Sequence, residues 1–596
     1  MAKSELTPES IAIARHSLSH ILAKAVMELF PGTKLAIGPA IDNGFYYDFD
    51  TEKPLTEADF PAITDKMTEI IKRMETFERR ELSRQEALEI FKDQPYKVEL
   101  IEELPEDETI SMYFTGDDFT DLCRGPHVEN SRDLLRWAFQ LMSVTGAYWR
   151  GNEKNKMLQR VYVYAFPDKK ELKAYITERE EAKKRDHNKL GRELEYFTTV
   201  DYIGQGLPII LPKGTTVIRT LQRFVEDEEE RRGYLQTKTP MLAKRELYKI
   251  SGHWDHYRDG MFVMGDPEKW EDENEEILAL RPMTCPFQFQ AYLNRMRSYR
   301  DLPLRYNETS TLFRNEASGE MHGLIRVRQF TISEGHLACR PDQLEDEFRG
   351  CLELAQFMLE TLGLDDDVSY RFSKWDENDK EKYIGDKSEW EAVQGTMRTI
   401  LDDIGIDYTE EDGEAAFYGP KLDIQIKNVF GKEDTLITIQ IDFQLAERFG
   451  MEYVDTDGQK KYPYVIHRTS IGCYERTLAL IIEKYAGALP PWLMPEQVRV
   501  LTITDNQNEY ANSIVEKLRN LGIRAKCDDR NEKIGFKIRE ARTEKLPYIL
   551  VVGDKEIEEN AVAVRTRTSG DLGAMPVDEF ITKLMGDIST RSKTTF

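Results

Sequence analysis

Two histidines four residues apart, His16 and His20, lie in a segment whose pattern predicts a helix. That spacing places both imidazoles on the same face of the helix. Far downstream, the stretch Asp121-Leu-Cys123-Arg-Gly-Pro-His127 adds a thiol and a third imidazole. The histidines and the cysteine make a donor set that suits zinc binding or proton transfer in hydrolysis. A histidine pair alone is more often structural, so the downstream cysteine and histidine are what favour a hydrolytic or metal site.

A second set of reactive side chains is scattered along the chain: Cys285, His336 and His467. Their spacing alone does not join them, and each taken by itself is more typical of a core or surface residue. Two arginines stand in suggestive contexts, Arg314 before a Ser-Gly turn and Arg476 in a helical stretch. Guanidinium groups bind phosphates through paired hydrogen bonds and keep their charge. Arginines that converge on one cleft would suit a nucleoside triphosphate, whereas a surface ion pair is the alternative for any single one.

The composition describes a large acidic protein. Its 596 residues allow about four domains of roughly 150 residues each. With 82 Lys and Arg against 108 Asp and Glu, the formal net charge is −26, which excludes a general nucleic-acid binder but not a local basic surface. The six cysteines form no CxxC pair and are too few for a disulfide framework. No apolar run is long enough for a membrane span and the N-terminus has no signal-peptide core, so we expect a cytoplasmic protein.

The elements that must position these residues begin with residues 1–166, which are expected to form an α+β domain. The expected elements are a helix from Pro8 to about Phe30, short strands within 34–50, helices over 56–78 and 83–93, and a closing strand at 161–166. Residues 167–195 are dense in charge and helical in pattern, which predicts a solvated linker helix.

The remaining chain divides into two regions. Residues 196–495 mix strands with three or four long helices in no regular βαβα order, which predicts an antiparallel sheet with flanking helices. Residues 496–596 alternate strands and helices and predict a compact α/β domain. Its segment 524–545 holds eight basic and five acidic residues. This segment is interpreted either as a phosphate-binding face or as an ordinary solvated helix.

The motifs around these residues resemble a known family. RNE at 314–316 with RVRQF at 326–330 is similar to motif 2 of the class II aminoacyl-tRNA synthetases, and 472–476 is similar to their motif 3. The helix 215–233, with the strand that ends at Pro240, resembles motif 1, their dimer-forming element. Six stretches resemble signatures of the threonyl-tRNA synthetases, in family order: SGHWDHY, RPMTCP, RNEASGEMHGLIRVRQF, EAAFYGPKLD, IHRTSIG and RNEKIGFKIRE.

The resemblance covers residues from about 10 to 585 and implies both a fold and an activity. The implied fold is a class II antiparallel sheet with flanking helices, an N-terminal α+β editing domain and a C-terminal α/β anticodon-binding domain. The implied activity joins L-threonine to its tRNA through a threonyl-adenylate, using ATP with Mg²⁺, and hydrolyses mischarged seryl-tRNA. A homodimer, one Zn²⁺ per subunit and no membrane association are also implied.

The resemblance assigns roles to individual residues. The implied zinc ligands are Cys285, His336 and His467. The implied catalytic residues are Arg314 and Arg476 on the ATP phosphates, Glu316 on the adenine side and His253 near the tRNA acceptor end. The implied residues of the amino acid and ATP pocket are Arg326, Glu334, Tyr418, Lys421, Gln440 and Asp442.

Two other sites receive residues in the same way. The implied editing residues are His16, His20, Tyr47, Lys97, Asp121, Cys123 and His127. The implied anticodon-binding residues are Asn531, Glu556 and Arg565.

Two features depart from the family pattern. Many members carry a small ubiquitin-like domain before the editing domain, and this chain is expected to lack it. After Phe330 the chain has Thr-Ile-Ser-Glu-Gly-His, where bacterial relatives commonly show Gln and Asp two residues apart. Glu334 can replace the acid with a reach one methylene longer, but Ile332 cannot replace the amide. Substrate contacts from this strand are therefore expected to differ in detail.

Three other functions stay open on the sequence. A related synthetase for serine or proline is the nearest alternative, but Cys285 with His336 and His467, together with the domain order, favours threonine. An inactive RNA-binding regulator is disfavoured because the ATP arginines and the zinc ligands are present. A metal-dependent hydrolase built on His16 and His20 would leave the long ATP-site region without a purpose.

Overall fold

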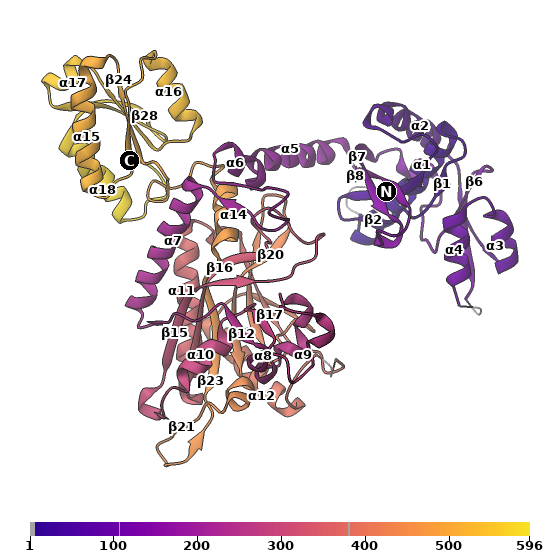
Figure 1. Cartoon of the computed structure of the whole chain (residues 1–596). Helices are drawn as coiled ribbons and strands as arrows, with labels where there is room; N and C mark the ends of the chain where they lie inside the picture. Colours follow the sequence, from indigo (N-terminus) through magenta and orange to yellow (C-terminus); the bar gives the residue numbers. More distant parts are fainter. Residues whose placement is uncertain (1–5, 106–107, 380–381) are drawn as a thin grey trace. The chain divides into compact units, whose positions relative to one another are not determined.

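The computed structural model describes residues 6–105, 108–379 and 382–596. The chain divides into two compact units, residues 1–180 (the N-terminal unit) and residues 181–596 (the second unit). Helix α5 (Lys169–Arg185) runs across the division. Each unit has its own hydrophobic core, and the elements of both can be followed in Figure 1.

The N-terminal unit is built on α1 (Pro8–Leu29), which starts where the sequence predicts. Thr7 caps this helix by accepting a hydrogen bond from the backbone nitrogen of Ser10, and Pro8 occupies the first turn. Its apolar side packs against α2 (Phe60–Lys72) and a five-stranded antiparallel sheet. The sheet has the order β1-β3-β8-β7, with β2 beside β3. Its strands are β1 (Lys34–Leu35), β2 (Ala40–Ile41), β3 (Gly44–Asp50), β7 (Ala138–Tyr148) and β8 (Met157–Phe166).

A smaller sheet of the same unit corrects one expected helix. It contains β4 (Phe77–Leu82), β5 (Ile110–Thr115) and β6 (Phe119–Leu122), with α3 (Arg84–Ile90) and α4 (Pro95–Glu103) packed nearby. The helix expected over 56–78 ends at Lys72, Met74 adopts a left-handed backbone conformation, and Phe77 already belongs to β4. The charged stretch 78–81 has good helix formers, but pairing with β5 fixes it as a strand.

The second unit contains an eight-stranded sheet in the order β11-β15-β16-β23-β20-β19-β17-β18. Neighbouring strands are antiparallel except for the edge pairs β11–β15 and β17–β18. The strands are β11 (Leu235–Gln236), β15 (Leu304–Phe313), β16 (Gln329–Cys339), β17 (Val368–Ser373), β18 (Tyr408–Glu411), β19 (Lys421–Lys427), β20 (Glu433–Asp442) and β23 (Tyr464–Cys473). The predicted antiparallel sheet is confirmed.

Helices around this sheet build the largest core. The long ones are α7 (Pro212–Arg231), α11 (Leu344–Leu362), α12 (Lys387–Ile404) and α14 (Tyr474–Lys484). The short helix α6 (His187–Glu193) packs on α14. Other short helices are α8 (Arg245–Ser251), α9 (His253–His256), α10 (Cys285–Tyr292) and α13 (Leu445–Phe449). Two small ladders join β9 (Phe197–Thr198) to β10 (Ile209–Ile210) and β12 (Leu242–Lys244) to β13 (Leu278–Leu280). A third small sheet has the order β14-β21-β22, formed by β14 (Arg297–Ser298), β21 (Tyr453–Val454) and β22 (Lys460–Lys461).

The C-terminal region forms an α/β domain with its own sheet, in the order β25-β24-β26-β27-β28. β25, β24 and β26 are parallel to one another, whereas β27 runs antiparallel to both of its neighbours, β26 and β28. The strands are β24 (Val498–Thr502), β25 (Ala525–Asp528), β26 (Tyr548–Val552), β27 (Ala561–Thr566) and β28 (Gly570–Pro576). The helices are α15 (Asn508–Asn520), α16 (Ile534–Thr543), α17 (Asp554–Glu558) and α18 (Val577–Ser589). Thus the predicted fold class, α+β regions with a C-terminal α/β domain, is confirmed.

Among the helices that the structure describes, none combines the length and the apolar character that crossing a lipid bilayer requires.

Candidate active sites

Four neighbouring strands of the eight-stranded sheet align site residues in one row. Across β16, β23, β20 and β19, His336 lies opposite His467, His467 lies opposite Gln440, and Gln440 lies opposite Lys421. Directly opposed residues on neighbouring strands share a face of the sheet. The antiparallel register therefore gathers side chains that are far apart in the sequence.

Cys285 completes a three-residue group with His336 and His467, called here the Cys–His–His group. Cys285 is the first residue of α10. The candidate ligand atoms of the three residues lie within 4.8 Å of one another, and all three residues are buried. One thiol and two imidazoles are ligands that zinc prefers, and three protein ligands are typical of a site that keeps a position open.

Side chains behind the two imidazoles fix their orientations. His336 Nδ1 donates to Gln288 Oε1 at 2.5 Å, while its Nε2 is buried without a hydrogen-bond partner in the described part of the chain. His467 Nε2 donates to Asp442 Oδ2 at 2.9 Å, so Nδ1 is the ring nitrogen that Asp442 does not engage. Burial lowers the pKa of His336 and raises the pKa of the Cys285 thiol. A neutral imidazole with a buried lone pair, beside a thiol whose ionisation needs a cation, fits zinc.

These groups line a cavity of about 740 Å³. Ligand sites for small molecules commonly have about 300–1,000 Å³. Eleven expected site residues line it: His253, Cys285, Arg314, Glu316, Arg326, Glu334, Tyr418, Lys421, Gln440, His467 and Arg476. The other two, His336 and Asp442, reach it through the Cys–His–His group and through the hydrogen bond to His467.

Arg314 and Arg476 bring positive charge to this cavity, and neither pairs with a carboxylate within the described residues. Arg314 Nε is buried without a hydrogen-bond partner there, and its guanidinium lies 5.2 Å from the ring centre of Phe330. Arg476 Nε donates to the carbonyl of Ile325 at 2.9 Å, and Nη1 donates to the carbonyl of Thr435. Burial lowers the pKa of Arg476, but an arginine stays charged at neutral pH. Two guanidinium groups with unused donors make an anion site.

Glu316 and Arg326 meet each other in the loop between β15 and β16. Arg326 Nε lies 2.9 Å from Glu316 Oε2, and Arg326 also pairs with Glu320 at 3.0 Å. Arg328 donates to the backbone oxygen of Glu316 at 3.0 Å. The loop therefore orders its own charges, and Arg326 is free to meet an anion only by loosening these pairs.

Tyr418 and His253 form another part of the cavity wall. The Tyr418 hydroxyl donates to Gln440 Oε1 at 2.6 Å, and its ring stacks on His467 with ring centres 4.9 Å apart. His253 is buried, and its Nδ1 lies 2.8 Å from the hydroxyl of Ser251. Burial and the nearby His467 lower the pKa of His253 to about 3, so this ring is neutral.

The two residues that depart from the family pattern, Ile332 and Glu334, both line the cavity. Glu334 Oε2 accepts a hydrogen bond from the backbone nitrogen of Thr284 at 3.1 Å, and Oε1 lies 3.6 Å from His336 Nε2. The longer acidic side chain is thus placed beside the Cys–His–His group, while the apolar Ile332 offers no hydrogen bond.

Three residues that belong to the site were missed from the sequence. Gln288 orients His336, and its position one helical turn after Cys285 was an available signal. Arg371 lines the cavity with a buried Nε that has no partner in the described residues, but it arrives through strand register and carries no local signal. Arg468 lies opposite Gly335 and pairs with Glu229 at 2.8 Å.

The second candidate site lies in the N-terminal unit. The ligand atoms of His16, His20, Cys123 and His127 lie within 4.8 Å of one another. Cys123 Sγ is 3.3 Å from Nε2 of His16 and 3.3 Å from Nε2 of His127. Helix α1 supplies the first two histidines, whose ring centres are 5.4 Å apart, and the segment after β6 supplies the other two residues.

Three charged or polar residues expected at this site surround His20. Asp121 accepts a hydrogen bond from the Tyr47 hydroxyl at 2.5 Å, pairs with Lys97 at 2.5 Å and lies 3.6 Å from His20 Nε2. Burial lowers the pKa of His20 and raises the pKa of Tyr47. His20 Nδ1 is buried without a hydrogen-bond partner in the described residues. The site therefore offers neutral imidazoles that can accept protons, next to one carboxylate–lysine pair.

The expected anticodon residues lie on three elements of the C-terminal domain. Asn531 is exposed in the loop between β25 and α16. Glu556, on α17, accepts a hydrogen bond from the backbone nitrogen of Gly553 at 2.9 Å, and Arg565, on β27, pairs with Asp571. No hydrogen bond or ion pair joins the three expected residues in the described part of the domain.

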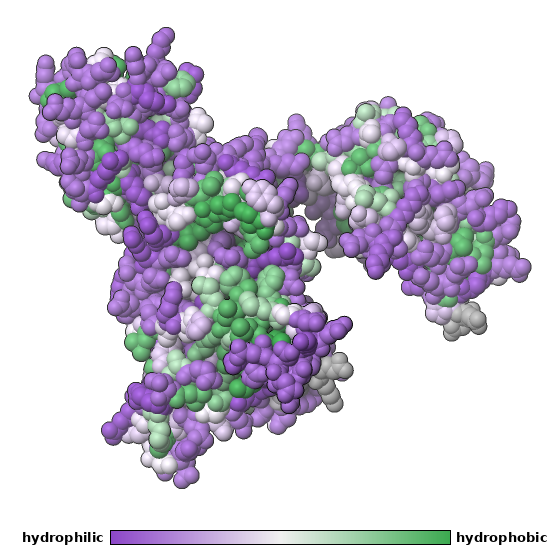
Figure 2. Space-filling view, viewed as in Figure 1, coloured by the Kyte–Doolittle hydropathy of each residue, from purple (hydrophilic) through white to green (hydrophobic). Residues whose placement is uncertain are grey.

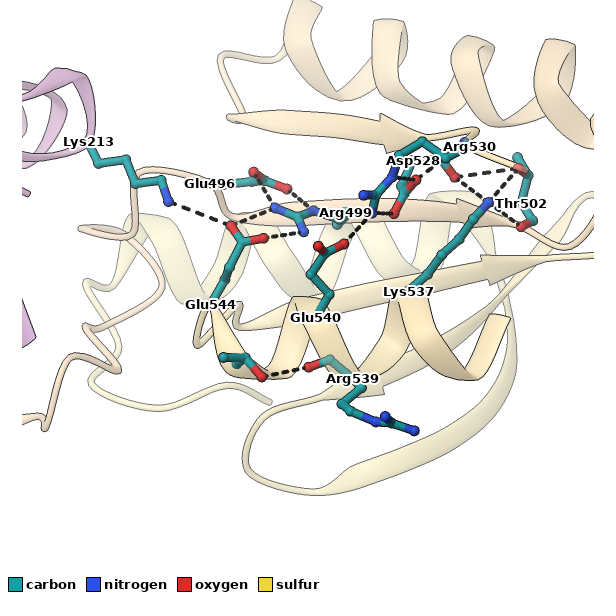
Figure 3. A network of polar contacts seen from close by, with 11 residues as sticks. Lys213, Glu496, Arg499, Thr502, Asp528, Arg530, Lys537, Arg539, Glu540 and Glu544 are labelled. Carbon is teal, nitrogen blue, oxygen red and sulfur yellow. Dashed lines mark hydrogen bonds and ion pairs between the residues drawn. The ribbon is translucent and has the colours of Figure 1, made fainter. Parts of the chain in front are cut away.

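Several basic side chains of the segment 524–545 are held inside the C-terminal domain by carboxylates or backbone oxygens (Figure 3). Arg530 pairs with Asp528 and Glu540. Lys537 is buried and donates to the backbone oxygens of Thr502 and Asp528, each at 3.0 Å. The basic residues of this segment that are exposed and make no ion pair in the described chain are Lys533, Arg539 and Arg542. The positive face is thus smaller than the charge count suggests.

Family models match three parts of the chain. The model described as tRNA synthetase class II core domain (G, H, P, S and T) matches residues 269–485. The anticodon binding domain matches residues 497–586. The threonyl and alanyl tRNA synthetase second additional domain matches residues 110–162, which include Asp121, Cys123 and His127.

Relatives match nearly the whole chain. The threonine–tRNA ligase of Clostridium perfringens (strain 13 / Type A) is 62% identical over 97% of this chain and 88% of its own length. That of Staphylococcus carnosus (strain TM300) is 46% identical over 98% of this chain and 89% of its own length.

Solved structures agree with these relatives. The RNA binding domain of threonyl-tRNA synthetase from Cryptosporidium parvum Iowa II covers 67% of this chain and 98% of that chain, with a TM-score of 0.63 and 32% identity. Prolyl-tRNA synthetase from Cryptosporidium parvum covers 68% of this chain and 75% of that chain, with a TM-score of 0.52 and 20% identity, and so shares the fold. The identity and coverage of the relatives, together with the three family models, show that this chain belongs to the threonyl-tRNA synthetases, a family of class II aminoacyl-tRNA synthetases.

Proposed function

We propose that this enzyme forms threonyl-adenylate from L-threonine and ATP, transfers the threonyl group to tRNA, and hydrolyses seryl-tRNA in its N-terminal unit. The observation that carries the proposal is one cavity bordered by both the Cys–His–His group and two arginines without carboxylate partners among the described residues. Zinc in the Cys–His–His group would bind the amine and the hydroxyl of threonine. The two arginines would bind the phosphates of ATP with its Mg²⁺.

Selection of the amino acid follows from the donor set. Zinc held by Cys285, His336 and His467 would supply open coordination positions for the amine and the hydroxyl of threonine. Valine lacks the hydroxyl, and an apolar pocket alone separates such isosteres only ~100-fold. Serine has both groups and lacks only a methyl, which is worth roughly 1–3 kcal/mol. This site therefore rejects valine well and serine poorly.

Adenylate formation needs charge stabilisation more than proton transfer. The threonine carboxylate attacks the α-phosphorus of ATP, a new P–O bond forms, and pyrophosphate leaves with the electrons of the broken bond. Arg314 and Arg476 line the cavity and would hold the phosphate oxygens, so positioning and electrostatics would supply the catalysis. His253, with a pKa of about 3, suits hydrogen bonding to the tRNA ribose in the transfer step better than it suits strong general-base catalysis.

ATP–pyrophosphate exchange with each standard amino acid tests the first site. Threonine should support rapid exchange, serine weak exchange, and valine almost none. Exchange that is fastest with proline or with serine would replace the threonine proposal by the related synthetase. No exchange with any amino acid, in folded protein that still binds tRNA, would favour the inactive regulator.

We propose that the N-terminal unit hydrolyses the ester of seryl-tRNA. A water oxygen attacks the ester carbonyl, the bond to the ribose oxygen breaks, and the ribose oxygen takes up a proton. His16 is less buried than His20 and is neutral because burial lowers its pKa, so it is the better candidate to accept the proton of the water. Asp121, which Lys97 and Tyr47 hold in place, would bind the amine or the ribose.

The editing proposal is tested by incubating the enzyme with purified seryl-tRNA and threonyl-tRNA and measuring deacylation of each. Seryl-tRNA should be hydrolysed and threonyl-tRNA largely spared. Equal rates that match spontaneous hydrolysis would remove this activity from the N-terminal unit and leave the adenylation proposal intact.

We propose a homodimer formed through the motif 1 region. In Figure 2, hydrophobic side chains gather over the part of the second unit where Figure 1 shows β12. Leu235 is 53% exposed, Met241 is 46% exposed and Leu242 is 39% exposed, all on or beside β11 and β12. Sedimentation equilibrium should give twice the chain mass, and Met241→Glu should shift the enzyme toward monomer. A wild-type monomer at micromolar concentration would refute the dimer.

The C-terminal domain is proposed to bind the anticodon of threonine tRNA through Asn531, Glu556 and Arg565. Their separate placement on a loop, a short helix and a strand supports contacts to successive bases rather than one shared ligand. The expected cytoplasmic location stays a prediction.

A further inference from the structure

His187 connects three segments of the second unit through one buried imidazole. It is the first residue of α6, which Asp186 caps by accepting a hydrogen bond from the backbone nitrogen of Asn188 at 2.8 Å. The His187 ring donates from Nδ1 to Glu483 Oε1 at 2.6 Å, near the end of α14. Its Nε2 accepts a hydrogen bond from the backbone nitrogen of Leu324 at 3.2 Å, in the loop between β15 and β16.

The loop is shaped to receive this ring. Gly323 has a φ of +51°, and a Cβ at this position would lie 2.1 Å from His187 Nε2. A side chain at Gly323 would therefore displace either the loop or the ring. Leu324 is fully buried, which leaves its backbone nitrogen dependent on His187 for a partner.

The contact leads directly to an ATP arginine. The residue after Leu324 is Ile325, whose carbonyl accepts the hydrogen bond from Arg476 Nε at 2.9 Å. Arg476 and Glu483 lie on the same helix, α14. The imidazole of His187 therefore hydrogen-bonds both to the loop that orients Arg476 and to the helix that carries Arg476.

A metal at this place is disfavoured, although Asp186, His187 and Glu483 form a group with suitable atoms within 4.8 Å. One nitrogen of His187 donates to Glu483 and the other accepts from Leu324, so no lone pair of the ring is unused. Glu483 Oε2 accepts from the backbone nitrogen of Val429 at 3.2 Å. Satisfied hydrogen bonds indicate a positioning role.

We propose that His187 is a positioning residue for ATP: it fixes the loop at Leu324 and so holds Arg476 in the orientation that binds phosphate. The proposal rests on the role of Arg476 in the proposed function. Without the imidazole, the Leu324 nitrogen loses its partner and the Ile325 carbonyl shifts, so Arg476 keeps only its contact with the Thr435 carbonyl and ATP must supply part of its order. The affinity for ATP falls for that reason.

Two substitutions of His187 separate the contact made by Nδ1 from the contact made by Nε2. In His187→Asn, the amide nitrogen can replace Nδ1 and keep the contact with Glu483, but nothing accepts from Leu324. In His187→Gln, the amide oxygen can reach the place of Nε2 and accept from Leu324. In threonine-dependent exchange, His187→Asn should raise the KM for ATP about fivefold or more, the effect of one lost hydrogen bond. His187→Gln should restore it to within about twofold of wild type, with the KM for threonine unchanged in both.

The matched control is Lys189→Ala, an exposed residue on the same helix. A purely structural role of His187 would lower thermal stability and the fraction of active enzyme without a selective change in the KM for ATP. The proposal is overturned if folded His187→Asn binds ATP as wild type does, or if His187→Gln is as defective as His187→Asn. A wild-type enzyme without threonine-dependent exchange would instead overturn the proposed function.

A second pair of variants tests the same contact from the loop, in case the His187 variants do not fold. Gly323→Ala should raise the KM for ATP because its Cβ meets His187. Gly319→Ala, in the same loop, has open space around the added Cβ and should leave the KM unchanged. Equal KM values for the two alanine variants would contradict the proposal.

Discussion

At the residue scale, unpartnered buried atoms mark both sites. Arg314, whose Nε has no partner, lines the large cavity; His336 Nε2 belongs to the Cys–His–His group beside it, and His20 Nδ1 lies in the N-terminal cluster. Leaving a buried polar group without a partner costs about 1–3 kcal/mol, so such a group beside a cavity or a donor cluster is a candidate contact for a ligand. The chemistry of the groups indicates the ligand: guanidinium for phosphate, and imidazole for a metal ion or a proton.

Arg476→Ala should cripple adenylate formation while tRNA binding persists. The variant removes a buried positive charge that is proposed to face the ATP phosphates, and loss of such a group costs about 3–4 kcal/mol, or ~10²–10³-fold in exchange rate. The exposed Arg300→Ala is the control and should exchange normally. Exchange by Arg476→Ala within a few-fold of wild type would show that the motif 3 arginine has been misassigned.

Cys285→Ala should remove the bound zinc together with threonine activation. The thiol is one of only three proposed ligands, and its loss leaves two imidazoles, which is too few for a tight zinc site. Cys351→Ala is the control, because Cys351 is buried in the core of α11 and contacts no proposed ligand. Metal analysis and exchange should be measured on the same samples. Full activity in zinc-free wild-type enzyme would refute the metal proposal.

At the element scale, local signals predicted elements well where they were strong. The cap at Thr7 fixed the start of α1, and short runs rich in apolar residues marked β24 and β26. In residues 496–596, predicted as alternating strands and helices, the short helix α17 and the glycine-containing β28 carry no clear period and could not be predicted individually. β4 was missed because its charged residues favour a helix and only pairing with β5 overrides that preference.

The site residues show the same limit. The motifs gave Cys285, His336 and His467 by resemblance, but local patterns could not show that they meet, because the register between β16 and β23 decides it. The position of Arg371 in the cavity and the contact of His187 with Leu324 depend on long-range packing. Neither could be predicted from the spacing of residues along the sequence.

Gly335→Ala should damage the zinc site through the packing between elements. A Cβ at Gly335 would lie 2.7 Å from the guanidinium carbon of Arg468, which is fully buried and held by Glu229 of α7. Overpacking of this kind costs about 1–3 kcal/mol, and the strain falls on β16 between Glu334 and His336. The urea concentration at the midpoint of unfolding and the zinc content of the enzyme should both decline.

Gly350→Ala is the matched control for this test. Gly350 lies in α11 with open space around an added Cβ, so the substitution should be neutral or stabilising by up to about 1 kcal/mol. A Gly335→Ala enzyme with wild-type stability and full zinc content would show that β16 adjusts without disturbing the site.

At the scale of the whole molecule, the two sites solve different parts of one selection problem. In the proposed function, the cavity of the second unit would distinguish threonine from valine by the hydroxyl, but a missing methyl gives too little free energy to exclude serine. Every proposed editing residue lies within residues 1–180, and every proposed activation residue lies within residues 181–596. The division of the chain therefore coincides with the division between the two proposed activities.

Removal of residues 1–180 should separate the two activities. The remaining unit keeps His187, its core and all three proposed zinc ligands, so threonine activation should stay within a few-fold of wild type, while seryl-tRNA accumulates. In the full chain, Asp121→Asn should have the same effect because it breaks the pair with Lys97, whereas the exposed Asp93→Asn should edit normally. Both are measured by charging tRNA with serine and following its release. If the shortened enzyme rejects serine unaided, discrimination resides in the cavity; if folded Asp121→Asn still clears seryl-tRNA, the editing assignment is wrong and the activation site stands.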